Sequence, residues 1–175
     1  MWTLVAIVAG LVAATWFVNH VNARHEAKRV ASGPTPDALV EQAWDEFTAH
    51  DEAGVMHERF DALMQRLDVE AIAQKQSLVR LAVMAVRAAG TDALTAIADR
   101  ASVVDPGCGE TRALDALAEA YAGPRELAIQ KLRVAGKGLA ACTGCGAGVE
   151  GGLLVQEVGV ALDALVSGEE LAREV

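Results

Sequence analysis

Residues 76–90, QSLVRLAVMAVRAAG, carry the clearest structural signal in this chain of 175 residues. Leu78, Leu81, Ala82 and Ala85 recur at spacings of three and four, which is the period of one apolar face of an α-helix. Much of the remaining chain has the same Ala- and Leu-rich character, and no strand-like alternation persists. The sequence therefore predicts an all-α protein.

Hydrophobic residues make up 53% of the chain, but aromatic residues make up only 4%. Ala, Leu and Val must therefore build the core, and such small side chains favour many close helix contacts over one bulky core. The net charge is −9, and the excess of acidic residues lies after the first 31 residues. Because an acidic domain repels phosphate, we expect no nucleic-acid partner.

The first eighteen residues contain no charged side chain, and the basic residues Arg24, Lys28 and Arg29 follow them. An uncharged apolar run of this length is typical of a membrane-spanning helix. No Lys or Arg precedes the run, which argues against a cleavable signal peptide. We therefore predict a single transmembrane anchor over residues 1–31, with Arg24, Lys28 and Arg29 in contact with lipid head groups.

The charges around this predicted anchor also indicate its orientation and its contacts. Basic residues lie only on its C-terminal flank, so the positive-inside rule predicts an N-terminus outside and a cytoplasmic soluble domain. Ala6, Gly10 and Ala14 recur every four residues and form a small-residue stripe, which allows two helices to pack closely. We expect this stripe to contact another transmembrane helix, from a second copy or from another subunit.

A Pro- and Gly-containing hinge at residues 32–36 separates the predicted anchor from an α-helical soluble domain at residues 37–175. Thr35, Pro36 and Asp37 form a helix-start signature for a first helix that ends near Ala49. Periodicity, capping residues and breakers predict the later helices. These cover residues 55–67, 68–90, 91–104, 110–122 and 124–141, and a last helix follows a Gly-rich loop at 144–152 and ends near Gly168.

Short turns between neighbouring helices imply antiparallel hairpins. The set Leu78, Leu81, Ala82 and Ala85 reappears 36 residues later as Leu114, Leu117, Ala118 and Tyr121. From Gln76 to Gly138 the chain thus resembles tetratricopeptide-type repeats, which pair helices at about this period. The resemblance implies an α-solenoid that binds partner peptides or subunits and has no catalytic role. An ordinary helical bundle is the alternative architecture.

The three cysteines are the candidate site for chemistry in this sequence. Cys108 precedes the predicted fifth helix, whereas Cys142 and Cys145 follow the sixth, so a hairpin of these two helices places all three at one end. Three states remain open. In the first, the Cys142-Thr-Gly-Cys145 motif exchanges as a dithiol, or it binds a metal together with Cys108 and an oxygen ligand. In the second, Cys108 forms a disulfide with one of the pair, and in the third all three remain reduced.

No catalytic motif or cofactor fingerprint stands out, so we expect neither an enzyme nor a bound cofactor. The sequence favours a membrane-anchored helical scaffold or adaptor, or an accessory subunit of a membrane protein complex. Its expected partners are the lipid bilayer and other proteins. The alternative from another class is a thiol-based redox or metal-binding module that uses Cys108, Cys142 and Cys145.

Overall fold

The computed structural model describes residues 33–49, 53–142, 148–169 and 171, and every regular element in these ranges is helical. The α-helices are α2 (Pro36–Ala49), α3 (Ala53–Met64), α4 (Lys75–Arg87), α5 (Leu94–Val104), α6 (Gly109–Ala122), α7 (Arg125–Ala141) and α8 (Gly148–Ser167). The short 3-10 turns η1 (Val69–Ala71) and η2 (Thr91–Ala93) precede α4 and α5. The prediction of an all-α protein is confirmed for the described residues.

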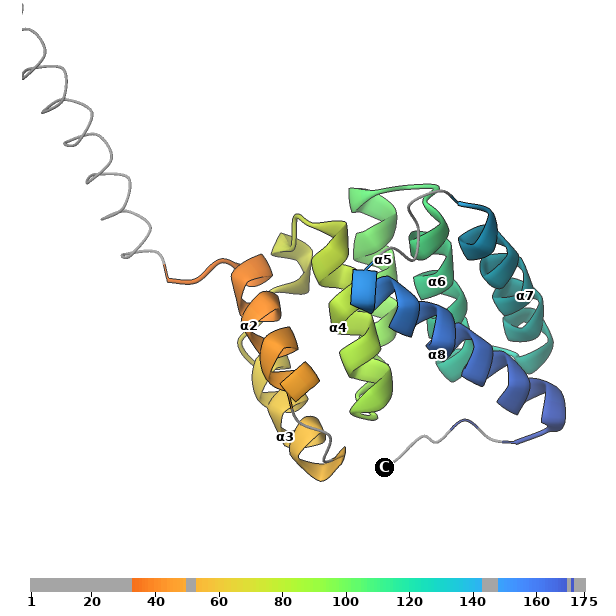
Figure 1. Ribbon diagram of the computed structural model, residues 1–175, viewed down its shortest axis with the longest axis horizontal. Coiled ribbons are helices and arrows are strands. Elements are labelled where there is room, and N and C mark those ends of the chain that lie inside the picture. Colours follow the sequence, from red (N-terminus) through yellow and green to blue (C-terminus); the bar gives the residue numbers. More distant parts are fainter. Residues whose placement is uncertain (1–32, 50–52, 143–147, 170, 172–175) are drawn as a thin grey trace, which may run out of the picture. The chain divides into compact units, whose positions relative to one another are not determined.

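Helices α4 to α7 stand side by side in the order of the chain, and α8 crosses this row (Figure 1). Neighbouring helices of the row pack against each other, and α8 contacts α4, α6 and α7. At one end of the row, α2 and α3 contact each other and pack against α4. Helix α8 therefore connects parts of the domain that are distant in the sequence.

Leucine and alanine fill the core, as the composition requires. The leucines Leu78, Leu81, Leu114 and Leu117 are fully buried. Alanines lie between them, and residues with such small side chains allow the helix backbones to approach closely. The buried aromatic residues Trp44 and Phe60 lie near the N-terminal end of the domain, on α2 and α3.

None of the described helices combines the length and the apolar character that a membrane crossing requires. The anchor that we predict at residues 1–31 lies outside the described part of the chain, so it stays a prediction.

The predicted third helix, from Asp68 to Gly90, begins too early. Asp68 caps only η1, where its carboxylate accepts a hydrogen bond from the Glu70 N–H at 3.2 Å, and α4 begins at Lys75. The chain between η1 and α4 is extended, because the Asp37 carboxylate binds the two N–H groups of residues 73 and 74 at 3.1 Å each. The prediction that Gly90 ends this helix is also wrong, since α4 ends at Arg87.

The predicted Gly-rich loop at residues 144–152 is shorter than expected. Helix α8 begins at Gly148, so the last glycines of the expected loop are helical. Their helical state depends on Glu150, whose buried side chain accepts a hydrogen bond from Gln76 on α4. A tertiary contact therefore outweighs the low helix propensity of glycine at this position.

Candidate functional site

Two of the three cysteines lie at the same end of the α6–α7 hairpin. Cys108 is the residue before α6, and Cys142 is the residue after α7. Because α6 and α7 pack as neighbours in an antiparallel pair, the start of one lies beside the end of the other (Figure 1). Cys145 lies outside the described residues.

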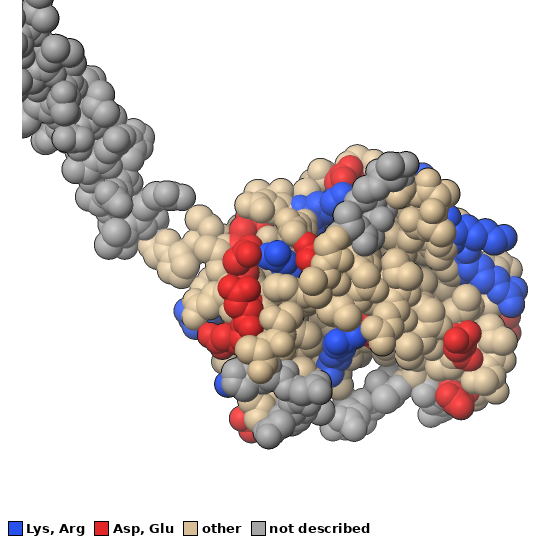
Figure 2. Space-filling view, in the orientation of Figure 1, with Lys and Arg blue, Asp and Glu red and all other residues tan. Residues whose placement is uncertain are grey.

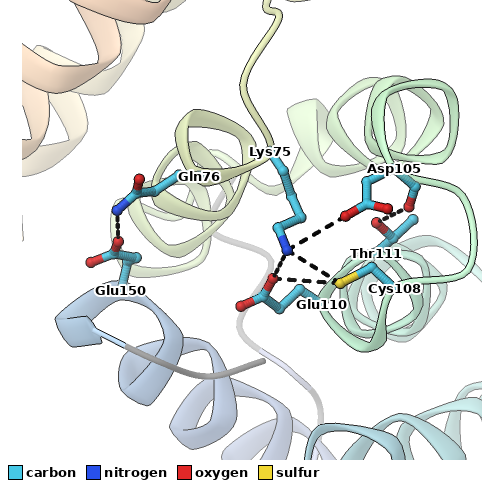
Figure 3. A network of polar contacts seen from close by, with 7 residues as sticks. All are labelled: Lys75, Gln76, Asp105, Cys108, Glu110, Thr111 and Glu150. Carbon is cyan, nitrogen blue, oxygen red and sulfur yellow. Dashed lines mark hydrogen bonds and ion pairs between the residues drawn. The ribbon is translucent and has the colours of Figure 1, made fainter. Parts of the chain in front are cut away.

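Cys108 belongs to a polar network around Lys75, the first residue of α4 (Figure 3). The Lys75 Nζ lies 2.7 Å from Glu110 Oε2 and 3.5 Å from Asp105 Oδ2, and it donates a hydrogen bond to Cys108 Sγ at 3.3 Å. The thiol in turn lies 3.6 Å from Glu110 Oε2, while Thr111 Oγ1 donates to the Asp105 carbonyl at 2.9 Å. These polar contacts connect the start of α4 to the loop between α5 and α6 and to the first turn of α6.

The electrostatics of this network are dominated by one ion pair. The hydrogen bond to the buried Glu110 carboxylate raises the pKa of Lys75 well above its usual value, although partial burial of the lysine opposes the shift. Lys75 therefore stays cationic at any physiological pH.

The redox states of the two described cysteines differ. Cys142 is disulfide-bonded, whereas Cys108 carries a thiol that donates to Glu110. The alternatives in which Cys108 forms a disulfide with Cys142 or Cys145, and in which all three cysteines remain reduced, are therefore wrong. Among the described residues, no group of three His, Cys, Asp or Glu side chains is placed to hold a metal ion.

A second polar arrangement fixes α8 on α4 and was not predicted from the sequence. Two buried carboxylates seven residues apart, Glu150 and Glu157, face two arginines seven residues apart, Arg80 and Arg87. The Arg87 Nε lies 2.7 Å from Glu157 Oε1, and the Arg80 Nη2 lies 3.8 Å from Glu150 Oε1. The sequence signal for this arrangement is the shared spacing, because the two acids and the two arginines are each seven residues apart.

The surroundings of the Glu150 carboxylate favour its charged form. Burial alone would raise the pKa of Glu150, but hydrogen bonds from its own backbone N–H and from Gln76, with the charge of Arg80, lower it below its usual value. Gln76 and Glu150 lie together at the left of Figure 3, next to the Lys75 network. Helix α8 is thus held in one register along α4 by directional polar contacts.

A cavity of about 200 Å³ between α2 and α3 is the other candidate site, and the sequence did not predict it. It is lined mostly by apolar side chains, which include Leu39, Phe47, Met56, Phe60, Leu63 and Met84. The charged side chains in its lining are Glu46, Arg59 and Arg66, and an Arg59 nitrogen lies 4.0 Å from a Glu46 oxygen. In a chain with few aromatic residues, two phenylalanines and two methionines gather at this one cavity.

Six of the predicted contact residues cannot be placed in this structure. The small-residue stripe of Ala6, Gly10 and Ala14 lies outside the described residues. The same holds for the predicted head-group contacts Arg24, Lys28 and Arg29. The roles of these six residues therefore stay predictions.

No protein-family model matches the chain, and searches of curated proteins and of solved structures find no significant similarity. The resemblance to tetratricopeptide-type repeats therefore rests on the residues quoted above.

Proposed function

We propose that this protein is a membrane-anchored helical adaptor, or an accessory subunit of a membrane complex, that binds another protein in the cavity between α2 and α3. The observation that carries the proposal is the composition of this cavity. Aromatic residues, methionine and arginine are the residue types enriched at protein interfaces. Here they gather at one opening of a domain that is otherwise built from Ala, Leu and Val.

The chemistry of the cavity suits an apolar side chain or an amphipathic helix from a partner. Phe47, Phe60 and Met56 offer rigid and adaptable apolar surface, and methionine in particular adjusts to partners of different shape. Arg59 and Arg66 add positive charge to the lining, which favours an acidic residue beside the partner's apolar face. The predicted anchor at residues 1–31 would hold this binding surface close to the membrane.

Photo-crosslinking in cells tests this proposal. Met56 is replaced by the photo-crosslinker benzoylphenylalanine, and the matched control carries the same group at the exposed residue Leu127 on α7. We expect a protein adduct of defined mass at residue 56 that is absent at residue 127. A second variant, Ala43→Arg, fills the cavity and should abolish the adduct while leaving the helical circular dichroism signal unchanged. An adduct that survives Ala43→Arg, or no adduct at residue 56, would contradict the proposal.

The disulfide at Cys142 favours thiol–disulfide exchange as a second candidate function. In such an exchange a thiolate of a dithiol partner protein attacks a disulfide sulfur, and a mixed disulfide forms while one sulfur leaves as a thiolate. The second partner thiolate then resolves the mixed disulfide, so that the partner is oxidised and the Cys142 disulfide is reduced. The Cys108 thiol lies at the same end of the domain, beside the positive charge of Lys75.

A labelling experiment distinguishes this second function from the adaptor and also tests the predicted orientation. A membrane-impermeant maleimide is applied to intact cells and to lysed membranes, with and without reductant. A redox module requires that the variant Cys142→Ser loses function and that the labelling of the wild type increases with reductant. An adaptor tolerates Cys142→Ser. Labelling only after lysis supports a cytoplasmic domain, whereas labelling of intact cells would contradict the predicted orientation.

A further inference from the structure

The outer face of α8 carries exposed apolar side chains although it points away from the domain. Four of the seven large hydrophobic side chains that are exposed in the described residues lie on this helix, with exposed fractions of 46–66%. We call these the outer valines: Val149, Val155, Val160 and Val166. Figure 2 shows the face that α8 crosses as largely uncharged along the helix. Several exposed apolar side chains on one helix face indicate a candidate contact surface.

The line of α8 directly opposite its buried face contains only small and polar residues. At 100° per residue, the direction opposite to the buried face is occupied by the central line of Gly152, Gln156, Gly159 and Asp163. Val149 and Val160 lie on one side of this line, and Val155 and Val166 lie on the other. Nothing within 4 Å occupies the space in front of Gly152 or Gly159. The face is therefore a shallow groove between two edges of valine.

We propose that α8 packs antiparallel against α8 of a second copy of this chain, about a two-fold axis between Glu157 and Val158. With this axis, Gln156 lies level with Gly159 of the second copy. Asp163 lies level with Gly152 of the second copy. Each polar side chain of the central line thus faces a glycine, so the sequence of the groove is complementary to itself in the antiparallel direction.

Charge also selects the antiparallel arrangement. Asp163 is the one formally charged residue in the central line, and antiparallel packing places it near the first turns of α8 in the second copy, where the helix dipole is positive. A parallel pair would instead place Asp163 against Asp163. The other acids of α8, Glu150 and Glu157, are buried against α4 and do not reach this surface.

The outer valines close both edges of the proposed interface. The two-fold axis places the equivalent edges of the two copies on the same side of the interface. Val160 of one copy therefore lies next to Val160 of the other, and the two are offset by about 7 Å along the helix axis. A single pair of helices buries less area than the ~1,200 Å² typical of stable complexes. We therefore expect a weak dimer, which crosslinking detects better than purification.

The test uses the full chain in cells that produce two copies with different epitope tags. Gln156, close to the proposed axis, is replaced by benzoylphenylalanine in one copy. The matched control carries the same group at Val103, which is an exposed valine on α5. We expect a crosslinked product that carries both tags from residue 156 and not from residue 103. A product that joins one tagged copy to a different protein, or no product at all, would overturn the proposal.

Charge pairs at Val160 distinguish this interface from proximity caused by any other contact. Because Val160 lies next to its counterpart, Val160→Glu in both copies should reduce the doubly tagged product about tenfold, and so should Val160→Lys in both. One copy with Val160→Glu and one with Val160→Lys should restore it. If the product from two Val160→Glu copies equals that of the wild type, the α8 interface does not exist. This outcome is independent of the cavity between α2 and α3.

Discussion

The ion pair between Arg87 and Glu157 should stabilise the domain only as long as both partners are present. Their Nε and Oε1 atoms lie 2.7 Å apart, with 31% of the Arg87 side chain and 10% of the Glu157 side chain exposed. The variant Arg87→Met keeps most of the apolar stem but leaves a buried carboxylate without its cation. Breaking a fully buried pair in this way costs about 3–5 kcal/mol. Because Arg87 is partly exposed, we expect Arg87→Met to lower the free energy of unfolding by about 2–3 kcal/mol.

For a domain of this size, such a loss lowers the melting temperature by about 6–12 °C. The measurement is a thermal scan of the full chain in mild detergent, followed by circular dichroism at a helix wavelength. Arg59→Met is the matched control, because the pair of Arg59 with Glu46 is longer, at 4.0 Å, and both side chains are about half exposed. Its free energy of unfolding should change by about 0.5 kcal/mol or less.

The double variant Arg87→Met/Glu157→Leu provides the decisive comparison. Replacing both partners of a buried pair with apolar residues is often neutral, because no unpaired charge remains. We therefore expect the double variant to be more stable than Arg87→Met alone. If it is equally unstable or less stable, the loss in Arg87→Met does not arise from an unpaired Glu157, and the reasoning is refuted.

Three further predictions concern other described contacts. Because the pKa of Glu150 is lower in the folded state, its stabilising effect is present above its unfolded pKa of about 4.5 and is lost as the pH falls below it. In Glu150→Gln, the urea midpoint of unfolding should therefore decrease less between pH 6 and pH 3 than it does in the wild type. Gly90→Ala would place a Cβ 2.3 Å from the Phe60 ring and should destabilise the domain by about 1–3 kcal/mol. Gly136→Ala on α7, whose added Cβ meets nothing within 4 Å, should instead stabilise the domain by up to about 1 kcal/mol in the same urea titration. Asp37→Ala removes the acceptor for two N–H groups before α4 and should lower the unfolding free energy by about 1–2 kcal/mol, and an unchanged urea midpoint would contradict that capping role.

Local signals were sufficient to predict α6 and α7. The predicted helix at residues 110–122 differs by one residue from α6, and the Gly123-Pro124 turn separates it from α7 in both cases. Proline fixes the backbone of the first helical turn and glycine interrupts the preceding helix, so these residues act without help from distant parts of the chain. The positions of Cys108 and Cys142 followed from the same two helix ends.

The start of α4 could not be predicted, because the group that determines it is distant in the sequence. Asp68 looks like an N-cap residue and does cap a turn, but only η1 follows it. Asp37, more than thirty residues earlier, binds the backbone N–H groups that precede α4. No periodicity or local propensity records such a contact. The cavity between α2 and α3 escaped prediction for a similar reason, since its lining comes from separate helices.

Helix α8 reverses the usual relation between polarity and burial, and this reversal has consequences on both of its faces. Its acids Glu150 and Glu157 are buried, whereas its outer valines are exposed. A buried carboxylate needs a cation at a defined position, so the inner face favours a single register of α8 on α4. A purely apolar contact between Ala and Leu side chains would specify that register less strictly. An exposed valine gains nothing from water, so the outer face is stabilised when another apolar surface covers it. The same helix can therefore fix the internal arrangement of the domain and join two copies of it, and substitutions on the two faces should separate these effects. Arg87→Met should lower the melting temperature, while Val160→Glu in both copies should reduce crosslinking about tenfold and leave the melting temperature unchanged.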